Sequence, residues 1–292
     1  MKNLQRALLF VLIAPTLALA QATDAPMRSD PPKGISIPDV IRAFAQKEGE
    51  FAKAREQYTY RQSVKVQTMD DDRVDGEYQQ VTDINFDSQG RRLEQVIYAP
   101  QNTITRVSMT TEDFNMIRNI IPFVVTPETM VDYTITYVGQ QKVDELDTYV
   151  FDINPKQLLK GKLYFDGRVW VDQQDLQVVM SSGKNVFDAK NKHKEDDQQF
   201  PRFTTWREQI DGHFWFPTYC RADDLLHFPG GKHQMAQDVH IREIIKFTNY
   251  KRFGTAVKIT YDGSEVMKGE KAAAPASGPP TGTAPASKPP KQ

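Results

Sequence analysis

The pattern of apolar and polar residues changes its period near Tyr58. Before that residue, apolar side chains recur at spacings of three, four and seven, which is typical of a helix with one buried face. Ser36, Pro38 and Asp39 supply a hydroxyl cap, a proline in the first turn and a carboxylate three residues on. The apolar positions are Val40, Ile41, Phe44, Phe51, Ala54 and Tyr58. We therefore predict a helix from Ser36 to about Gln57 that packs on a sheet, and as a sharper hypothesis that it covers the mouth of a cavity.

Beyond Tyr58, apolar and polar side chains alternate over most of the chain, which is typical of half-buried strands. We count about ten or eleven strands and two helices, with hairpin-length connections between most strands. The predicted strands include a three-stranded meander at Tyr58 to Val66, Gly76 to Phe86 and Arg91 to Tyr98, and a last pair at Val239 to Thr248 and Ala256 to Tyr261. An antiparallel sheet of this width cannot stay flat, so it should curl toward a barrel.

One hairpin in this series carries large aromatic side chains on both of its faces. Asp211-Gly212 is a strong signal for a two-residue turn, which would place Trp206 opposite Pro217. Trp206 and Trp215 then share one face, and the other face holds Phe203, Phe214 and Phe216. A sheet buried on only one side would not need this pattern, so we interpret the hairpin as barrel wall.

The first 20 residues have the three parts of a secretory signal peptide. Lys2 and Arg6 form the positive end, an apolar run follows, and Ala18-Leu19-Ala20 is a cleavage signal. The apolar run is shorter than the roughly 20 residues that span a bilayer, so we predict cleavage after Ala20, export to the periplasm and no stable membrane span. The remaining 35 basic and 38 acidic residues give a net charge of −3, which gives no reason to propose nucleic acid as a partner.

Composition divides the rest of the chain into three parts. Residues 21–35 are rich in Pro, Asp and Lys and are predicted to be a flexible lead-in. Residues 36–263 hold the open-barrel domain, in which Thr110 begins a short second helix and the charged run from Val186 to Gln199 forms an exposed loop. Residues 264–292 are rich in Pro and Ala and are predicted to be a disordered tail, alternatively a spacer or a ligand for a proline-binding partner.

No motif for catalysis stands out. The densest set of metal-ligand types is Cys220, Asp223, Asp224, His227, His233 and His240, and its spacings match no zinc pattern. Cys220 is the only cysteine, so no intramolecular disulfide can form, and a buried small apolar side chain is its better interpretation. We predict no metal, cofactor or catalytic residue, and keep as a minor alternative a hydrolase that uses Cys220 or the Asp223 and His227 group.

A strand and turn signature in the middle of the chain resembles that of a known superfamily. Its parts are Tyr149-x-Phe151-x-Ile153-x-Pro155, Gly167-x-x-Trp170-Val171-Asp172, Leu176-x-Val178 and Trp215-Phe216-Pro217. This signature is similar to that of the LolA/LolB-like lipoprotein carriers, whose superfamily includes sigma-factor regulators of the RseB and MucB type, over roughly residues 37–261. The resemblance implies an unclosed, strongly curved antiparallel β-barrel, helices that lid its concave face, and a hydrophobic cavity that holds acyl chains.

These observations predict a non-enzymatic, monomeric binding or carrier protein of the periplasm, whose partner is a lipid or a lipidated protein. An apolar cavity gains on the order of 25 cal/mol for each Å² of acyl chain removed from water. The candidate cavity residues are Phe44 and Phe51 on the helix, with Phe151, Trp170, Trp206 and Trp215 on strands. The alternative is a regulatory or envelope-assembly module that binds another protein.

Overall fold

The computed structural model describes residues 25–87, 89–107, 125–188, 200–228, 235–253, 258–261 and 264–267. The chain divides after Arg252 into two compact units. The predicted signal peptide, the second helix predicted at Thr110 and most of the predicted charged loop lie outside the described residues. No helix among the described residues is long and apolar enough to cross a membrane.

Helix α1 spans Ile37–Arg55, and the sequence places both of its ends. The hydroxyl of Ser36 accepts a hydrogen bond from the backbone N–H of Asp39 at 3.2 Å, which satisfies one of the free donors of the first turn. Lys53 and Arg55 lie in the last turn, where cations complement the helix dipole. The predicted helix and its cap are therefore confirmed.

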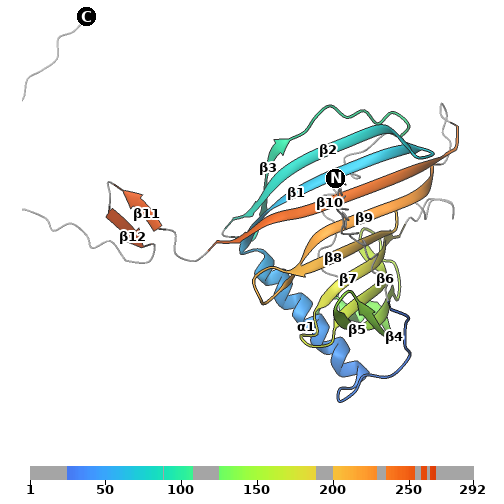
Figure 1. Cartoon of the computed structure of the whole chain (residues 1–292), viewed down its shortest axis with the longest axis vertical. Helices are drawn as coiled ribbons and strands as arrows, with labels where there is room; N and C mark the ends of the chain where they lie inside the picture. Colours follow the sequence, from blue (N-terminus) through green and yellow to red (C-terminus); the bar gives the residue numbers. More distant parts are fainter. Residues whose placement is uncertain are drawn as a thin grey trace, which may run out of the picture. The chain divides into compact units, whose positions relative to one another are not determined.

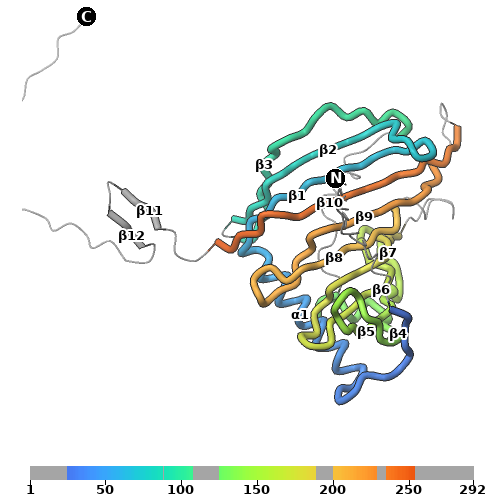
Figure 2. The backbone as a smooth tube through the Cα atoms, viewed as in Figure 1, coloured from blue at the N-terminus to red at the C-terminus, as the bar shows by residue number. Residues whose placement is uncertain are grey.

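Ten antiparallel strands of the first unit form one sheet. They are β1 (Tyr58–Asp70), β2 (Arg73–Phe86), β3 (Arg92–Tyr98), β4 (Tyr133–Val143), β5 (Leu146–Pro155), β6 (Leu163–Asp172), β7 (Val178–Phe187), β8 (Phe203–Gln209), β9 (Trp215–Phe228) and β10 (Gln237–Arg252). The strand order is β3-β2-β1-β10-β9-β8-β7-β6-β5-β4. Since β3 and β4 end this order without pairing to each other, the sheet is unclosed, and it curves strongly (Figure 1, Figure 2). The predicted fold class, an open and strongly curved β-barrel with a helix, is confirmed.

The last two predicted strands are present, but they do not pair with each other as predicted. Both edges of β10 are occupied, one by β1 and the other by β9, so no edge remains for a further strand. In the second unit, β11 (Lys258–Tyr261) pairs instead with β12 (Ser264–Met267). Strand β12 falls at the start of the segment predicted as a tail, and residues 268–292 lie outside the described ones.

The register predicted for the aromatic hairpin is also wrong, because its loop is longer than two residues. The carboxylate of Asp211 accepts hydrogen bonds from the backbone N–H groups of His213 and Phe214, at 3.0 and 3.2 Å. This side-chain turn takes residues out of the strands, so β8 ends at Gln209 and β9 begins at Trp215. After a register shift next to it, Trp206 pairs with Tyr219 rather than with Pro217.

Residues 25–31 lie along β4, at one end of the sheet. The backbone groups of Arg28 and Gln140 exchange two hydrogen bonds, at 2.8 and 2.7 Å. The hydroxyl of Tyr137 donates to the carbonyl of Asp30 at 2.5 Å. Gly139 permits this approach, since a Cβ there would lie 2.2 Å from the carbonyl oxygen of Arg28. These contacts hold against the sheet a segment whose composition predicted flexibility.

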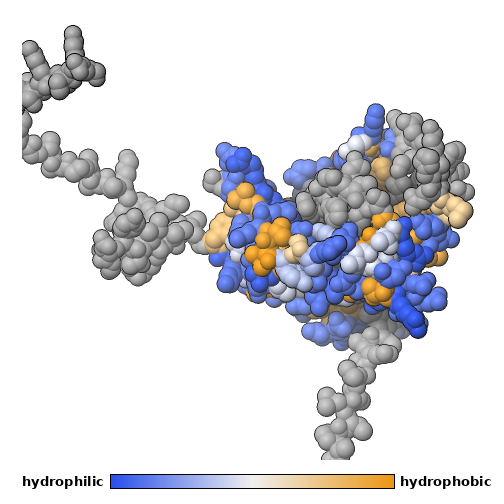
Figure 3. Space-filling view, turned by 90° about the horizontal axis from the view of Figure 1, so that it is seen from above, coloured by the Kyte–Doolittle hydropathy of each residue, from blue (hydrophilic) through white to orange (hydrophobic). Residues whose placement is uncertain are grey.

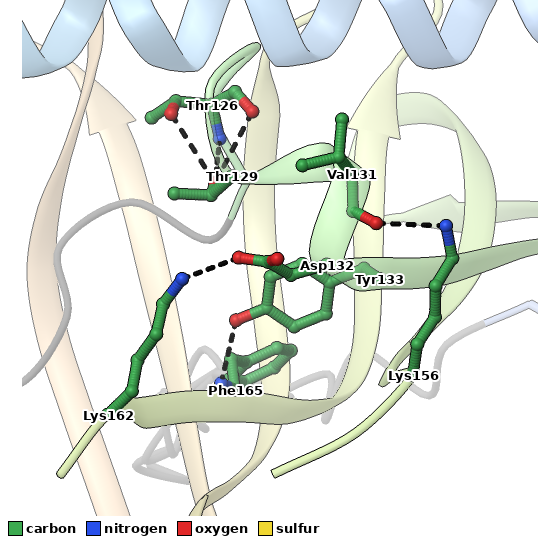
Figure 4. Close-up of polar contacts among 8 residues, drawn as sticks. All are labelled: Thr126, Thr129, Val131, Asp132, Tyr133, Lys156, Lys162 and Phe165. Carbon is green, nitrogen blue, oxygen red and sulfur yellow. Dashed lines mark hydrogen bonds and ion pairs between the residues drawn. The ribbon is translucent and has the colours of Figure 1, made fainter. Parts of the chain in front are cut away.

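The connection that leads into β4 passes beneath α1 (Figure 4). A short 3-10 helix, Met130–Asp132, follows a turn in which the backbone N–H of Thr126 donates to the hydroxyl of Thr129 at 2.9 Å. The next residue, Tyr133, accepts a hydrogen bond at its hydroxyl from the backbone N–H of Phe165 at 3.2 Å. Because the Tyr133 hydroxyl bonds to β6 across β5, it ties the three strands at this end of the sheet together.

Candidate functional site

The buried face of α1 contacts the concave face of the sheet, and three of its residues make specific ring or polar contacts. The rings of Phe44 and Phe151 on β5 have centroids 5.3 Å apart, and the rings of Phe51 and Phe216 on β9 are 5.1 Å apart and nearly perpendicular. Between Phe44 and Phe51 lies Glu48, and the three residues form one stripe because they are four and three positions apart. The helix therefore crosses from β9 to β5.

Glu48 makes the polar contact of this stripe. The guanidinium of Arg207 on β8 donates two hydrogen bonds to the Glu48 carboxylate, at 2.6 and 3.0 Å. Both side chains are almost fully buried. The Arg207 guanidinium carbon also lies 5.4 Å from the centroid of the Phe51 ring, within the range of a cation–π contact. Helix and sheet are thus joined by one charged pair inside an apolar contact.

The structure brings the predicted phenylalanines to the concave face. Phe44 and Phe151 belong to the main buried cluster, while Phe51 belongs to a smaller one with Tyr58 and Phe216. Further rings of the main cluster, which were not among the predicted cavity residues, include Tyr60, Phe165, Phe203 and Phe247. Each of these rings lies on the side of its strand that carries the alternating apolar residues, so the alternation in the sequence could have identified it.

None of the three tryptophans belongs to these two buried clusters. Trp170 alternates with residues of the buried cluster on β6, so it faces the convex side, where its indole N–H donates to the Gln141 side chain at 2.7 Å. Trp206 is three positions from the buried Phe203 on β8, so its side chain also points to the convex side. Its ring lies against Tyr219, with centroids 5.6 Å apart. The indole N–H of Trp215 donates to the Asp175 carboxylate at 2.7 Å. Within the described part of the chain, none of the three indole rings contacts an aromatic ring of α1.

A line of buried polar side chains crosses the concave face from β8 to β10. Thr205 pairs with Cys220, and the neighbouring pair on β9 and β10 is Ala222 with Glu243. All three polar residues are buried, with exposed fractions of 5%, 1% and 8% for Thr205, Cys220 and Glu243. Glu243 was not among the predicted site residues, because a glutamate in a strand is ordinarily exposed to solvent.

The electrostatics of this line follow from its burial. Burial, and to a smaller extent the Glu243 charge, raise the pKa of the Cys220 thiol to about 12, while the nearby Thr205 hydroxyl opposes the change. Burial also raises the pKa of the Glu243 carboxyl to about 7. Oxygen Oε1 of Glu243 has no hydrogen-bond partner among the described residues. A thiol with this pKa is a poor nucleophile near neutral pH.

The candidate metal ligands do not converge. Among the described residues, no three His, Cys, Asp or Glu side chains lie close enough together to hold a metal ion. Asp223 accepts hydrogen bonds from Arg221 and Arg242, at 2.7 and 3.1 Å, and contacts His240. Burial opposes the ionised form of Asp223, but these partners keep its pKa well below its ordinary value. His227 pairs separately with Asp238 at 2.7 Å, and His233 lies outside the described residues.

No protein-family model matches the chain, and no curated protein sequence matches it. Several solved structures do. A DUF1329 family protein from Desulfovibrio piger matches at 13% identity and a TM-score of 0.33, over 71% of this chain and 93% of that one. A LolA superfamily protein from Nitrosomonas europaea matches at 14% identity and a TM-score of 0.29, over 72% and 94%. MucB, in complex with MucA(peri), matches at 8% identity and a TM-score of 0.20, over 68% and 93%.

The matched structures include the LolA and MucB kinds of protein that the sequence resemblance named. Because these TM-scores and identities are low, the class of fold rests on the strand order and register of this chain itself.

Proposed function

We propose that this protein is a non-enzymatic binding or carrier protein of the periplasm that holds an acyl chain, of a lipid or of a lipidated protein, on its concave face beneath α1. One observation carries this proposal. The concave face is mainly apolar and rich in aromatic rings, and α1 lies over it while the sheet stays open. An acyl chain laid along this face would gain about 25 cal/mol for each Å² of its surface removed from water.

The two faces of the sheet differ in the way that such a role requires. Ion pairs lie on the convex face, where Arg61 contacts Asp83 at 2.7 Å and Arg168 contacts Asp152 at 2.7 Å, and all four side chains are partly exposed. Apolar side chains of the same strands belong to the main buried cluster on the concave side. The charged side chains of the convex face are exposed to solvent, so the concave face is the side that fits an apolar ligand.

The first experiment examines protein isolated from the envelope of the cells that export it. Native mass spectrometry should show an added mass that organic extraction removes, and the extracted protein should bind a fluorescent fatty acyl probe. Phe151→Leu should weaken probe binding several-fold, because it removes aromatic contact from the concave face. The matched control, Trp206→Leu, changes a ring on the convex face and should leave probe affinity unchanged. An unmodified mass together with no probe binding would overturn the proposal.

The alternative function, a module that binds another envelope protein, is favoured by one feature of β3. This end strand exposes Leu93, Val96, Ile97 and Tyr98, with exposed fractions of 51%, 53%, 46% and 52%. Apolar patches are visible on an otherwise mainly hydrophilic surface in the view from above (Figure 3). Exposed apolar end strands are common sites of pairing with another chain. A photo-crosslinker at Ile97 should then capture one envelope protein that the same group at Leu225, which is exposed on β9, does not.

A further inference from the structure

The polar strip formed by Thr205, Cys220 and Glu243 crosses the concave face from β8 to β10. In the strand register, Glu243 lies between Ala222 on β9 and Val66 on β1. The next row places Cys220 between Thr205 on β8 and Ile245 on β10. The cross-strand neighbours of Glu243 are therefore both aliphatic, and buried polar side chains occupy diagonal positions, Cys220 on β9 and Thr68 on β1.

The strip costs the folded protein free energy. A buried polar atom without a hydrogen-bond partner destabilises a protein by roughly 1–3 kcal/mol, and most such atoms in native proteins are satisfied. Among the described residues, oxygen Oε1 of Glu243 has no such partner. By contrast Glu48, the other buried carboxylate of this face, is neutralised by Arg207. The carboxyl of Glu243 therefore lacks a hydrogen bond that a polar group of a ligand could supply.

The chemistry of the strip selects a particular kind of polar group. A buried carboxyl with a thiol at a diagonal position, and with no cation beside it in the strand register, favours its own neutral, protonated form. In that form its O–H is a hydrogen-bond donor, as is the Thr205 hydroxyl. The matching ligand group is a neutral acceptor, and a free carboxylate would place a second acid against Glu243.

Resting on the proposed function, we infer that the polar strip is the subsite for the carbonyl group that joins an acyl chain to its head group, as an ester or an amide. The apolar chain lies along the aromatic part of the concave face. Its carbonyl oxygen accepts a hydrogen bond from the protonated carboxyl of Glu243. The ligand class is thus a neutral acyl ester or N-acyl compound, and free fatty acids bind less tightly.

The test compares ligands that differ only in the carbonyl. 1-Palmitoylglycerol and 1-O-hexadecylglycerol are an ester and an ether with the same chain and head group, and each is used to displace a fluorescent probe from the lipid-free protein. One hydrogen bond of ordinary strength predicts that the wild-type protein binds the ester about three- to tenfold more tightly than the ether. The same displacement is then measured with a short peptide that carries an N-palmitoyl group and with palmitate itself. The affinities of the peptide, the glycerol ester and palmitate distinguish a lipidated protein, a lipid and a free acid as the source of the acyl chain.

Two substitutions of Glu243 test whether the polar strip causes the preference for the ester over the ether. Glu243→Leu should abolish the preference for the ester while leaving ether affinity unchanged. Its melting temperature should stay level or rise, because the substitution removes a buried carboxyl that lacks a partner. Glu243→Gln keeps a donor in the same place and should keep the preference. The control Glu208→Leu removes an exposed carboxylate from β8 and should change neither affinity.

The outcomes separate this inference from the function on which it rests. If the wild-type protein binds both glycerol compounds equally, or if Glu243→Leu keeps the preference for the ester, the subsite assignment is wrong and the acyl-binding function stands. If the wild-type protein binds neither compound, both proposals fail.

Discussion

The carboxylate of Glu48 on α1 receives two hydrogen bonds from the guanidinium of Arg207 on β8, which lies 159 residues further along the chain. Because both side chains are almost fully buried, removal of one partner leaves the other charge without compensation. We expect Arg207→Met to lower the free energy of unfolding by about 3–5 kcal/mol, measured by urea denaturation.

Two further variants distinguish the buried pair from an ordinary surface contact. The double variant Glu48→Leu with Arg207→Met should recover most of the lost stability, since no unpaired charge remains. Arg61→Ala breaks a partly exposed pair with Asp83 and should cost about 1 kcal/mol or less. Equal losses for Arg207→Met and Arg61→Ala would contradict the role assigned to burial.

Glu243 predicts a dependence of stability on pH. Burial raises its pKa in the folded protein to about 7 from an ordinary value of 4.5. The folded state therefore keeps a proton that the unfolded state loses as pH rises above 4.5. This stabilising contribution is fully present below pH 4.5 and is lost as pH rises to about 7, and its size is about 3 kcal/mol.

The measurement is the difference between the wild-type protein and Glu243→Gln in free energy of unfolding, taken from pH 4.5 to pH 8. This difference removes most of the contribution of other titrating groups, such as Asp223. We expect the wild-type protein to lose stability relative to the variant as pH rises. A difference that stays constant across this window would show that Glu243 does not titrate as its burial implies.

The thiol of Cys220 should be unreactive in the folded protein. Its burial and its pKa of about 12 leave almost no accessible thiolate at pH 8. A thiol-specific chromogenic reagent should therefore label the protein only after unfolding in urea. A cysteine introduced in place of Leu225, which is 57% exposed on the same strand, provides the positive control. Rapid labelling of native Cys220 would revive the minor hydrolase hypothesis.

Gly139 should control the attachment of residues 25–31 to the sheet. In Gly139→Ala the new methyl group would lie 2.2 Å from the carbonyl oxygen of Arg28, so the two backbones must separate. We expect faster hydrogen exchange at the amides of Arg28 and Gln140, and a loss of stability of about 1–2 kcal/mol. Tyr137→Phe removes only the hydrogen bond to Asp30 and should have a smaller effect. Unchanged exchange in Gly139→Ala would contradict the close approach.

The local pattern of the sequence was sufficient for the elements themselves. Ser36 caps α1 because its side chain and the free N–H groups of the first turn are neighbours in the chain. The alternation of apolar residues likewise determined which side chains share a face within a strand. The register of the aromatic hairpin was predicted wrongly, because the side-chain turn of Asp211 lengthened the loop and moved every later pair.

The candidate site depended much more on contacts between distant segments. Phe44, Phe51 and Phe151 could be selected from periodicity, since their strands and helix must bury an apolar face. Trp170 and Trp206 were selected as large aromatic residues, but the alternation of side chains along β6 and β8 places them on the convex side. The Glu48–Arg207 pair carries no local signal, because its two residues are brought together only by the packing of α1 on β8.

The sequence by itself therefore determined the helix, most of the strands, their order along the chain and the class of fold, because these follow from interactions between residues close together in the chain. Only the tertiary structure decided that β1 pairs with β10, that α1 crosses β9, β8 and β5, and that Glu243 is buried beside Cys220. The physical reason is that burial and charge compensation are set by what lies across the sheet, and neighbours along the chain do not specify those partners.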